Sequence, residues 1–359
     1  MDETYERRSG NMKSVLVNAD KSLQIVDVPM PQIDSTSVLV KTLACGICNG
    51  TDTKIIHGAF KNVDQYPTLL GHEAVGEVVE VGKDVTNFKV GDRVLSPIIE
   101  GGLGDYSSAW GSFSEYSVCR DWQAMARNGI GPGTPSFADG IYTQKKIPAD
   151  FDPVSSVMII TLREVLSAAY VFGFRANESI VIHGAGPVGL SFIKFAKLLG
   201  MGPVICFEVV EDKLAAAAEA GADYCFNSKE VDMTAEVRRL CPNGVDYSLD
   251  AVGINGLISS GMKLIRDGGK LLTYGISPKL DMNLDWADAP YNWSLQFYQM
   301  PIKKAEAAAH EQLISWIRMG VVNPMDYISH VLPFQDVLKG FEMVEARQVP
   351  IKKIVIKYY

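Results

Sequence analysis

The chain contains no long uninterrupted apolar run. Although 47% of its 359 residues are hydrophobic, no stretch approaches the ~18 consecutive apolar residues of a membrane-spanning helix. It also lacks an excess of positive charge, because 34 Lys and Arg stand against 42 Asp and Glu and give a net charge of −8. A phosphate backbone would be repelled unless basic residues were clustered, and the sequence has no such cluster. We therefore expect neither a membrane-integral nor a nucleic-acid-binding protein.

Cysteine is scarce and scattered. Six cysteines without framework spacing in a long chain indicate thiols in a reducing compartment. The first ten residues, MDETYERRSG, place acids and arginines where a signal peptide needs a basic start and then an apolar core. We expect a cytoplasmic protein with a polar tail over residues 1–11. Only Cys45 and Cys48 are spaced in a way that suggests chemistry.

The length predicts two domains, at roughly 100–200 residues per domain. Residues 12–157 show short strands separated by Gly and Asp turns, typical of a small barrel or sandwich, with a Gly/Pro-rich loop at 126–144. Over residues 158–300, strands alternate with helices, which predicts a doubly wound parallel sheet. Residues 301–359 are assigned to the first domain, since their final strand, PIKKIVIKYY, is suited to rejoin it. The predicted fold class is α/β.

A glycine-rich motif opens the parallel-sheet domain. Its sequence, GAGPVG, follows an apolar strand and precedes a predicted helix, the context in which GxGxxG binds a dinucleotide. The first glycine permits a tight turn, the second lets a pyrophosphate approach, and the third lets helix pack on strand. The alternative is an ordinary glycine turn. The candidate cofactor-binding residues are Gly184, Gly186, Pro187, Val188 and Gly189.

The position of Glu208 bears on whether the chain prefers NAD or NADP. It lies nineteen residues after Gly189, at the end of the next predicted strand, where a carboxylate accepts hydrogen bonds from the adenosine ribose. It would also repel a 2′-phosphate, and Val209 and Val210 supply no arginine to bind one. NAD is therefore expected rather than NADP, unless Glu208 is simply a solvated acid.

A second group of motifs carries metal-binding residues. CGICNGTD over residues 45–52 is followed about twenty residues later by Gly71-His72-Glu73. Thiolate and imidazole suit Zn²⁺, and a catalytic zinc needs three protein ligands and one open position. The cysteine and histidine therefore predict a zinc site.

The order CGIC-x-x-TD, GHE, VGDRV and GAGPVG resembles the zinc-dependent medium-chain alcohol dehydrogenases, near the sorbitol and threonine dehydrogenase branches. The resemblance runs from Met12 to Lys357. It implies a GroES-like catalytic domain that is split in sequence around a Rossmann domain. It also implies oxidation of alcohols, or reduction of carbonyls, with zinc and NAD(P), in a homodimer or homotetramer.

The same resemblance implies roles for particular residues. Cys48 and His72 match zinc ligands, Glu73 matches the acid beside the metal, and Cys45 matches a position that is not a ligand. Thr51 matches the hydroxyl that passes on the substrate proton, although Asn49-Gly50 inserts one residue before it. Residues further assigned to catalysis or to the cofactor site are Lys54, at the position of a relay histidine, Lys213 and Gly275.

The third zinc ligand of the family is absent. Family spacing places a glutamate or cysteine at or next to Ile160, which cannot bind a metal. Glu164 lies one helical turn further along. It either reaches the metal or the nicotinamide, or it pairs with a nearby base such as Arg163 or Arg175. Since residues 97–116 contain no cysteine, one catalytic zinc and no structural zinc are expected.

The expected reaction is hydride transfer between NAD and a secondary alcohol of the sugar, polyol or cyclitol class, with zinc as Lewis acid. One alternative is a metal-free quinone or enoyl-type reductase on the same fold, although such relatives generally lack the Cys and GHE pair. The other alternative is a non-catalytic NAD-binding protein.

Overall fold

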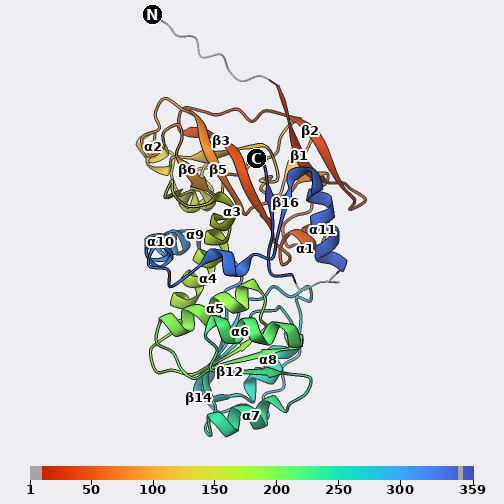
Figure 1. Ribbon diagram of the computed structural model, residues 1–359, viewed down its shortest axis with the longest axis vertical. Coiled ribbons are helices and arrows are strands. Elements are labelled where there is room, and N and C mark those ends of the chain that lie inside the picture. Colours follow the sequence, from red (N-terminus) through yellow and green to blue (C-terminus); the bar gives the residue numbers. More distant parts are fainter. Residues whose placement is uncertain (1–9, 347–350) are drawn as a thin grey trace, which may run out of the picture. The chain divides into compact units, whose positions relative to one another are not determined.

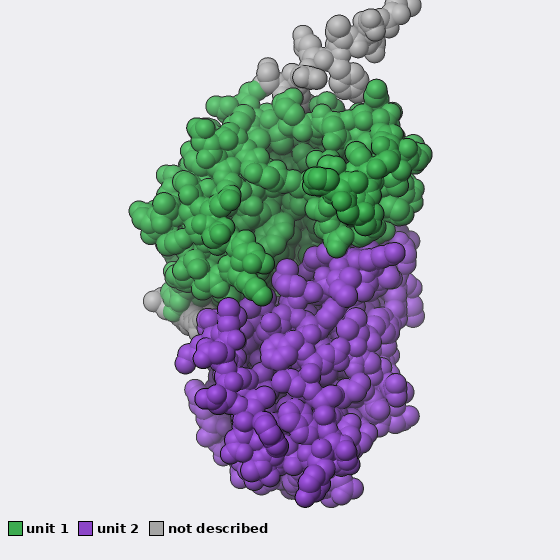
Figure 2. Space-filling model, turned by 180° about the vertical axis from the view of Figure 1, so that it is seen from behind, with its two compact units in different colours: residues 1–160, 324–359 green, residues 161–323 purple. Residues whose placement is uncertain are grey.

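The computed structural model describes residues 10–346 and 351–359. The chain divides into two compact units, residues 1–160 with 324–359 and residues 161–323 (Figure 2). Residues 1–9 of the expected tail lie outside the described residues. The tail is shorter than expected, because Asn11 already begins the first strand and pairs with Pro29.

The first unit consists mainly of short strands (Figure 1). Its elements are β1 (Asn11–Val17), β2 (Leu23–Pro29), β3 (Ser37–Ile47), α1 (Asp52–Ile56), β4 (Thr68–Leu69), β5 (Ala74–Val81), β6 (Arg93–Leu95), β7 (Ser107–Ser108), β8 (Tyr116–Arg120), α2 (Trp122–Arg127), β9 (Lys146–Ile147), α3 (Pro153–Ser156), β16 (His330–Pro333), α11 (Val337–Ala346) and β17 (Ile354–Lys357). They form a four-stranded sheet, β2-β1-β4-β7, and a seven-stranded sheet, β16-β17-β3-β5-β6-β9, with β8 on β3.

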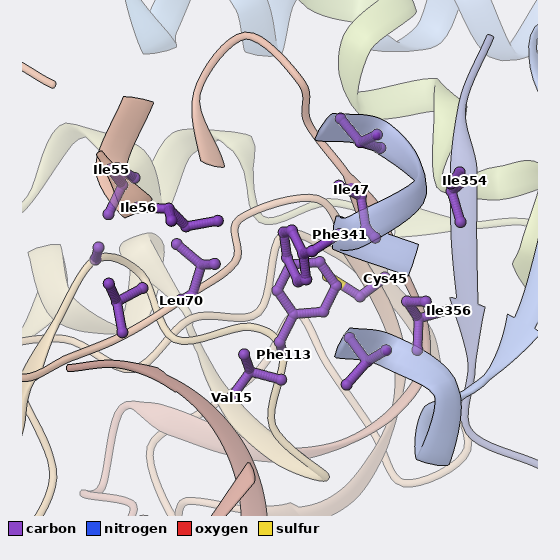
Figure 3. Packing of buried hydrophobic residues seen from close by; sticks show 14 of the residues in the cluster. Val15, Cys45, Ile47, Ile55, Ile56, Leu70, Phe113, Phe341, Ile354 and Ile356 are labelled. Carbon is purple, nitrogen blue, oxygen red and sulfur yellow. The ribbon is translucent and has the colours of Figure 1, made fainter. Parts of the chain in front are cut away.

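The last strand joins the first unit, as its sequence predicted. β17 pairs antiparallel with β3, so that Ile356 lies opposite Cys45 and Ile354 opposite Ile47. Figure 3 shows these side chains in one apolar cluster that also contains Phe113. Cys45 is completely buried there, and burial raises the pKa of its thiol well above the usual range. Cys45 is therefore a core residue.

The second unit is a parallel six-stranded sheet flanked by helices. Its elements are α4 (Met158–Phe172, which begins in the first unit), β10 (Ile180–His183), α5 (Pro187–Leu198), β11 (Val204–Glu208), α6 (Leu214–Ala220), β12 (Tyr224–Asn227), α7 (Met233–Leu240), β13 (Val245–Asp250), α8 (Asn255–Met262), β14 (Ile265–Thr273), β15 (Trp293–Phe297), α9 (Lys303–Ala308) and α10 (His310–Arg318). The strand order is β12-β11-β10-β13-β14-β15, the 3-2-1-4-5-6 order of a Rossmann fold. The predicted α/β class is confirmed.

Residues 301–323 were assigned to the first domain from the sequence, but they belong to the second unit. The physical reason is a set of ion pairs that joins α9 to α4, fully buried at Arg163 and Glu306 and partly exposed at Lys303 and Glu164. Arg163 Nη2 lies 2.7 Å from Glu306 Oε1, and both side chains are almost completely buried. Lys303 Nζ bridges Glu164 Oε1 at 2.9 Å and Glu306 Oε2 at 2.8 Å. Buried charges require such partners, and the sequence did not show which helix supplied them.

One helical stretch, Pro153–Phe172, is long and apolar enough by length and composition to cross a membrane. Within the fold, 78% of its most apolar window is buried. Core packing therefore accounts for its composition.

Candidate active site

Three metal-binding side chains meet in the first unit. Cys48 directly follows β3, and His72 and Glu73 lie between β4 and β5. One ligand atom from each residue lies within 4.8 Å of the other two. Sulfur, imidazole nitrogen and carboxylate oxygen are all donors that Zn²⁺ accepts, and three of them leave a fourth position open. The donor set therefore fits a catalytic zinc.

Two glycines make this cluster possible. Gly71 has φ +109°, and a Cβ there would lie 2.6 Å from the backbone nitrogen of Phe113. A Cβ on Gly46 would lie 2.7 Å from Glu73 Oε2. Any larger residue at Gly46 would therefore displace the carboxylate, and one at Gly71 would move the segment that carries His72. The glycines of CGIC and GHE are thus explained by close approach.

Asp52 supports the two neighbouring ligands, although the sequence assigned it no role. Its Oδ2 accepts from the Cys48 amide at 2.9 Å, and its own amide donates to Cys48 O at 2.8 Å. The inserted residue, in Asn49-Gly50, therefore lies within the turn that these two hydrogen bonds close between Cys48 and Asp52. Asp52 Oδ1 lies 3.3 Å from His72 Nδ1, which leaves Nε2 for a metal, as in carboxylate–histidine–zinc arrangements.

Electrostatics around this cluster favour positive charge. Burial lowers the pKa of His72, but Asp52 and Cys48 raise it by more, so that it lies well above its usual range. The pKa of Lys353 is likewise raised, because Glu73 and Cys48 outweigh the cost of burial. A cluster that stabilises cations in this way also suits Zn²⁺.

Lys353 is the second residue that sequence reasoning missed. Its Nζ lies 2.6 Å from Glu73 Oε2, and the two side chains are only 6% and 4% exposed. They are 280 residues apart in the chain, so no local pattern could join them. The basic character of the last strand was the only available signal. Lys353 fixes one oxygen of the carboxylate beside the metal-binding cluster.

The two proton-relay candidates differ in their surroundings. Thr51 directly precedes α1, and its hydroxyl has no hydrogen-bond partner among the described residues. Lys54 Nζ donates to Gly50 O at 2.8 Å, and burial lowers its pKa despite the opposing effect of Cys48. The Thr51 hydroxyl is therefore not committed to any described residue, while the Lys54 ammonium is held against the inserted turn.

In the glycine loop of the second unit, the three glycines have the local geometries expected for a tight turn, a phosphate approach and close helix–strand packing. Gly184 has φ +99°, and a Cβ there would lie 2.5 Å from Val252. A Cβ on Gly189 would lie 2.0 Å from Gly184 O, so helix and strand meet there. A Cβ on Gly186 would contact nothing within 4 Å. The open space is thus beside the second glycine, where a phosphate would approach, with Pro187 and Val188 in the first turn of α5.

Glu208 ends β11 and faces the same loop. Its Oε2 accepts from the Ala185 amide at 2.8 Å, and its Oε1 accepts from the Val209 and Val210 amides at 2.7 and 3.1 Å. The side chain is 7% exposed. Glu208 is therefore fixed at the carboxyl end of the sheet, where dinucleotides bind in this fold.

The remaining cofactor candidates lie near the same edge. Gly275 follows β14, and a Cβ there would lie 2.0 Å from the Gly253 nitrogen. Lys213 directly precedes α6, in the segment that leaves β11. A larger residue at Gly275 would therefore clash with the backbone of Gly253. Lys213 lies five residues after Glu208 in the sequence.

Glu164 has a partner within the second unit. Its Oε1 lies 2.9 Å from Lys303 Nζ, and the two side chains are 24% and 26% exposed. The base is therefore Lys303, and neither Arg163 nor Arg175, which the sequence had suggested. The cluster of metal-binding side chains found among the described residues does not include Glu164.

Comparisons with known proteins identify a family model for a segment of each unit. The model of the alcohol dehydrogenase GroES-like domain matches residues 34–129, and that of zinc-binding dehydrogenases matches residues 187–299. Sorbitol dehydrogenase of Bacillus subtilis is 31% identical over 286 residues, covering 77% of this chain and 78% of that protein. The chain belongs to the zinc-type medium-chain alcohol dehydrogenase family.

Other relatives support the same class. Alcohol dehydrogenase of Geobacillus stearothermophilus is 29% identical over 292 residues, covering 78% of this chain and 82% of that protein. The structure of a putative zinc-binding dehydrogenase from Sinorhizobium meliloti bound to NADP has a TM-score of 0.77 at 22% identity, covering 97% and 99% of the two chains. The first relative supports a zinc-type alcohol oxidoreductase, and the second supports the fold.

The Lys353–Glu73 pair predicts how zinc affects stability. In a Lys353→Met variant, the zinc-free protein should lose about 3 kcal/mol of stability, because Glu73 is left buried without its cation. Bound zinc would supply the missing charge, so the loss should be much smaller in the zinc-loaded protein. Urea unfolding with chelator and with zinc measures both values.

Lys352→Met is the matched control for that experiment. Lys352 is the preceding residue, and its Nζ donates to the Asp326 carbonyl. It should lose about 1 kcal/mol or less in both conditions. An equal loss with and without zinc in Lys353→Met would show that Glu73 does not share its charge with a metal.

Proposed function

We propose that this dehydrogenase transfers a hydride between NAD and a secondary alcohol of the polyol, sugar or cyclitol class. The observation that carries the proposal is the meeting of one thiol, one imidazole and one carboxylate, from Cys48, His72 and Glu73, within 4.8 Å. These three residues would hold a single catalytic zinc. The polyol class is supported by the similarity to a sorbitol dehydrogenase.

When bound at this cluster, zinc would supply a Lewis acid that lowers the pKa of the alcohol, and NAD would supply the hydride acceptor. The Thr51 hydroxyl, which has no partner among the described residues, takes the proton that the alcohol releases. As it accepts this proton, the Thr51 hydroxyl passes its own proton to water, or to Lys54 on the same turn when that amine is unprotonated. Asp52 holds His72 and Cys48 in place during the reaction.

The preference for NAD is supported by the charges beside the ribose site. Glu208 is fixed by three amides at the end of β11, and the exposed acids Glu211 and Asp212 follow shortly after it. A 2′-phosphate would face the Glu208 carboxylate, and the segment after it carries two further acids and, as its only base, Lys213. The free hydroxyls of NAD instead donate to Glu208.

We further propose a cytoplasmic homodimer or homotetramer. β15 is an outer strand of the parallel sheet, paired with β14 in the described structure. Large apolar side chains are exposed on it and on the preceding segment, among them Phe297 at 54% and Leu280 at 82%. An exposed apolar strand edge is a template for pairing with another chain.

The two other candidate functions are less well supported. A metal-free quinone or enoyl-type reductase has no use for the Cys48–His72–Glu73 cluster. A non-catalytic NAD-binding protein has no use for the Thr51 hydroxyl beside it. Metal analysis and turnover distinguish these functions from an alcohol dehydrogenase.

The cofactor prediction is tested by steady-state kinetics on zinc-loaded protein with a panel of polyols, sugars and cyclitols. We expect kcat/KM to be about tenfold or more higher with NAD than with NADP, because Glu208 binds the ribose diol and opposes a phosphate. A higher value with NADP would overturn the role given to Glu208. Cofactor binding without turnover of any alcohol in the panel would favour the non-catalytic alternative.

We also propose an active-site role for Glu164. Its partly exposed pair with Lys303 should contribute little to stability, so a purely structural role would leave kcat unchanged. We expect Glu164→Ala to lower kcat by about tenfold or more, or roughly 1.4 kcal/mol of barrier. Glu236→Ala, which breaks the exposed pair with Arg239, is the control and should leave kcat unaffected. Unchanged kcat and zinc affinity in Glu164→Ala would return Glu164 to a structural role.

A further inference from the structure

Trp110 has a strained backbone. Its φ is +68°, in the left-handed region, and it is the only aromatic residue with positive φ among the described residues. A side chain with a Cβ pays about 1–2 kcal/mol for this conformation. Such strain persists only where the surroundings impose it, and it is concentrated at functional sites. The position of Trp110 therefore requires an explanation.

Hydrogen bonds on both sides of Trp110 impose this conformation. The Ala109 amide donates to Leu69 O at 2.8 Å, and the Ser112 amide donates to Gly71 O at 2.9 Å. Trp110 O accepts from the Ile99 amide at 2.8 Å. The segment is thus fastened to the chain that leads directly into His72.

The result is an aromatic surface beside a metal ligand. The Trp110 ring centroid lies 5.3 Å from that of His72, and Phe60 meets Trp110 edge to face at 6.0 Å. His72 is 19% exposed, and both aromatic side chains are half-buried. No described residue accepts a hydrogen bond from the Trp110 indole N–H. The surface offers a flat apolar face and one unused donor.

We propose that Trp110, backed by Phe60, is a specificity-determining residue that binds the part of the substrate next to the reacting carbon. Its ring packs on C–H groups of a carbon chain or ring, and its N–H donates to a hydroxyl further along. These two features match a polyhydroxylated alcohol better than a simple one. The inference rests on the proposed function, because it takes the substrate to be held at Cys48, His72 and Glu73.

The test compares a polyol with a small secondary alcohol. Zinc-loaded wild type and the Trp110→Ala and Trp110→Phe variants are assayed with NAD on sorbitol, or on the best polyol of the panel, and on 2-propanol. Trp122→Ala is the matched control, since Trp122 lies in the same unit and packs on Tyr142. Zinc content and thermal unfolding are measured for every protein.

Trp110→Ala should raise KM for the polyol by about tenfold or more and change kcat little, since the ring binds ground and transition states alike. KM for 2-propanol should hardly change. Trp110→Phe keeps a ring without the N–H and should show a smaller increase. Trp122→Ala should behave as wild type. If Trp110→Ala is unstable, the comparison of Trp110→Phe with wild type decides the question.

A binding measurement adds a readout that does not depend on turnover. Adding the polyol to zinc-loaded protein should change tryptophan fluorescence in wild type and in Trp122→Ala, and the change should disappear in Trp110→Ala. An unchanged ratio of polyol to 2-propanol kcat/KM in both Trp110 variants would overturn this inference and leave the proposed function standing. A wild type that oxidises neither alcohol would overturn the proposed function, and this inference with it.

Discussion

One buried ion pair, between Lys353 and Glu73, connects the parts of the first unit on which the metal site depends. A lysine ammonium and a carboxylate that are almost fully buried are costly unless each satisfies the other. Lys353 directly precedes β17, which pairs with β3, and β3 ends just before Cys48. The carboxylate lies over Gly46, where a side chain would displace it. The register of the last strand, the glycine of CGIC and the orientation of a metal ligand therefore depend on the same contact.

The second unit holds its ligand-facing carboxylate differently. Glu208 accepts from three backbone amides, one of them in the glycine loop itself. Backbone donors carry no net charge, so they bring no cation to Glu208, and the preference proposed for NAD depends on that difference from Glu73. Glu73, beside a lysine, lies among groups that stabilise cations. The partner of each carboxylate thus suits the ligand proposed for it.

Much of this could be read from the sequence because it depends on local patterns. GAGPVG after an apolar strand predicted the Rossmann unit, and the basic, apolar last strand was correctly expected to rejoin the first unit. Residues 301–323 were misplaced because a helix pattern shows that one face is buried without showing which unit covers it. The deciding partners, Arg163 and Glu306, are 143 residues apart. Lys353 and Trp110 were missed for related reasons, since a long-range ion pair and a strained φ leave no local signature.

The central claim is that this chain builds a catalytic zinc site from one thiolate, one imidazole and one carboxylate. X-ray absorption of the zinc-loaded protein tests it most directly, together with zinc analysis of Cys48→Ala and Cys45→Ala. We expect about one zinc per chain, with one sulfur at about 2.3 Å and the remaining ligands nitrogen or oxygen at about 2.0–2.2 Å. Zinc should be lost in Cys48→Ala and kept in Cys45→Ala, whose cysteine is a core residue. Two or more sulfur ligands, or full zinc occupancy in Cys48→Ala, would contradict this account.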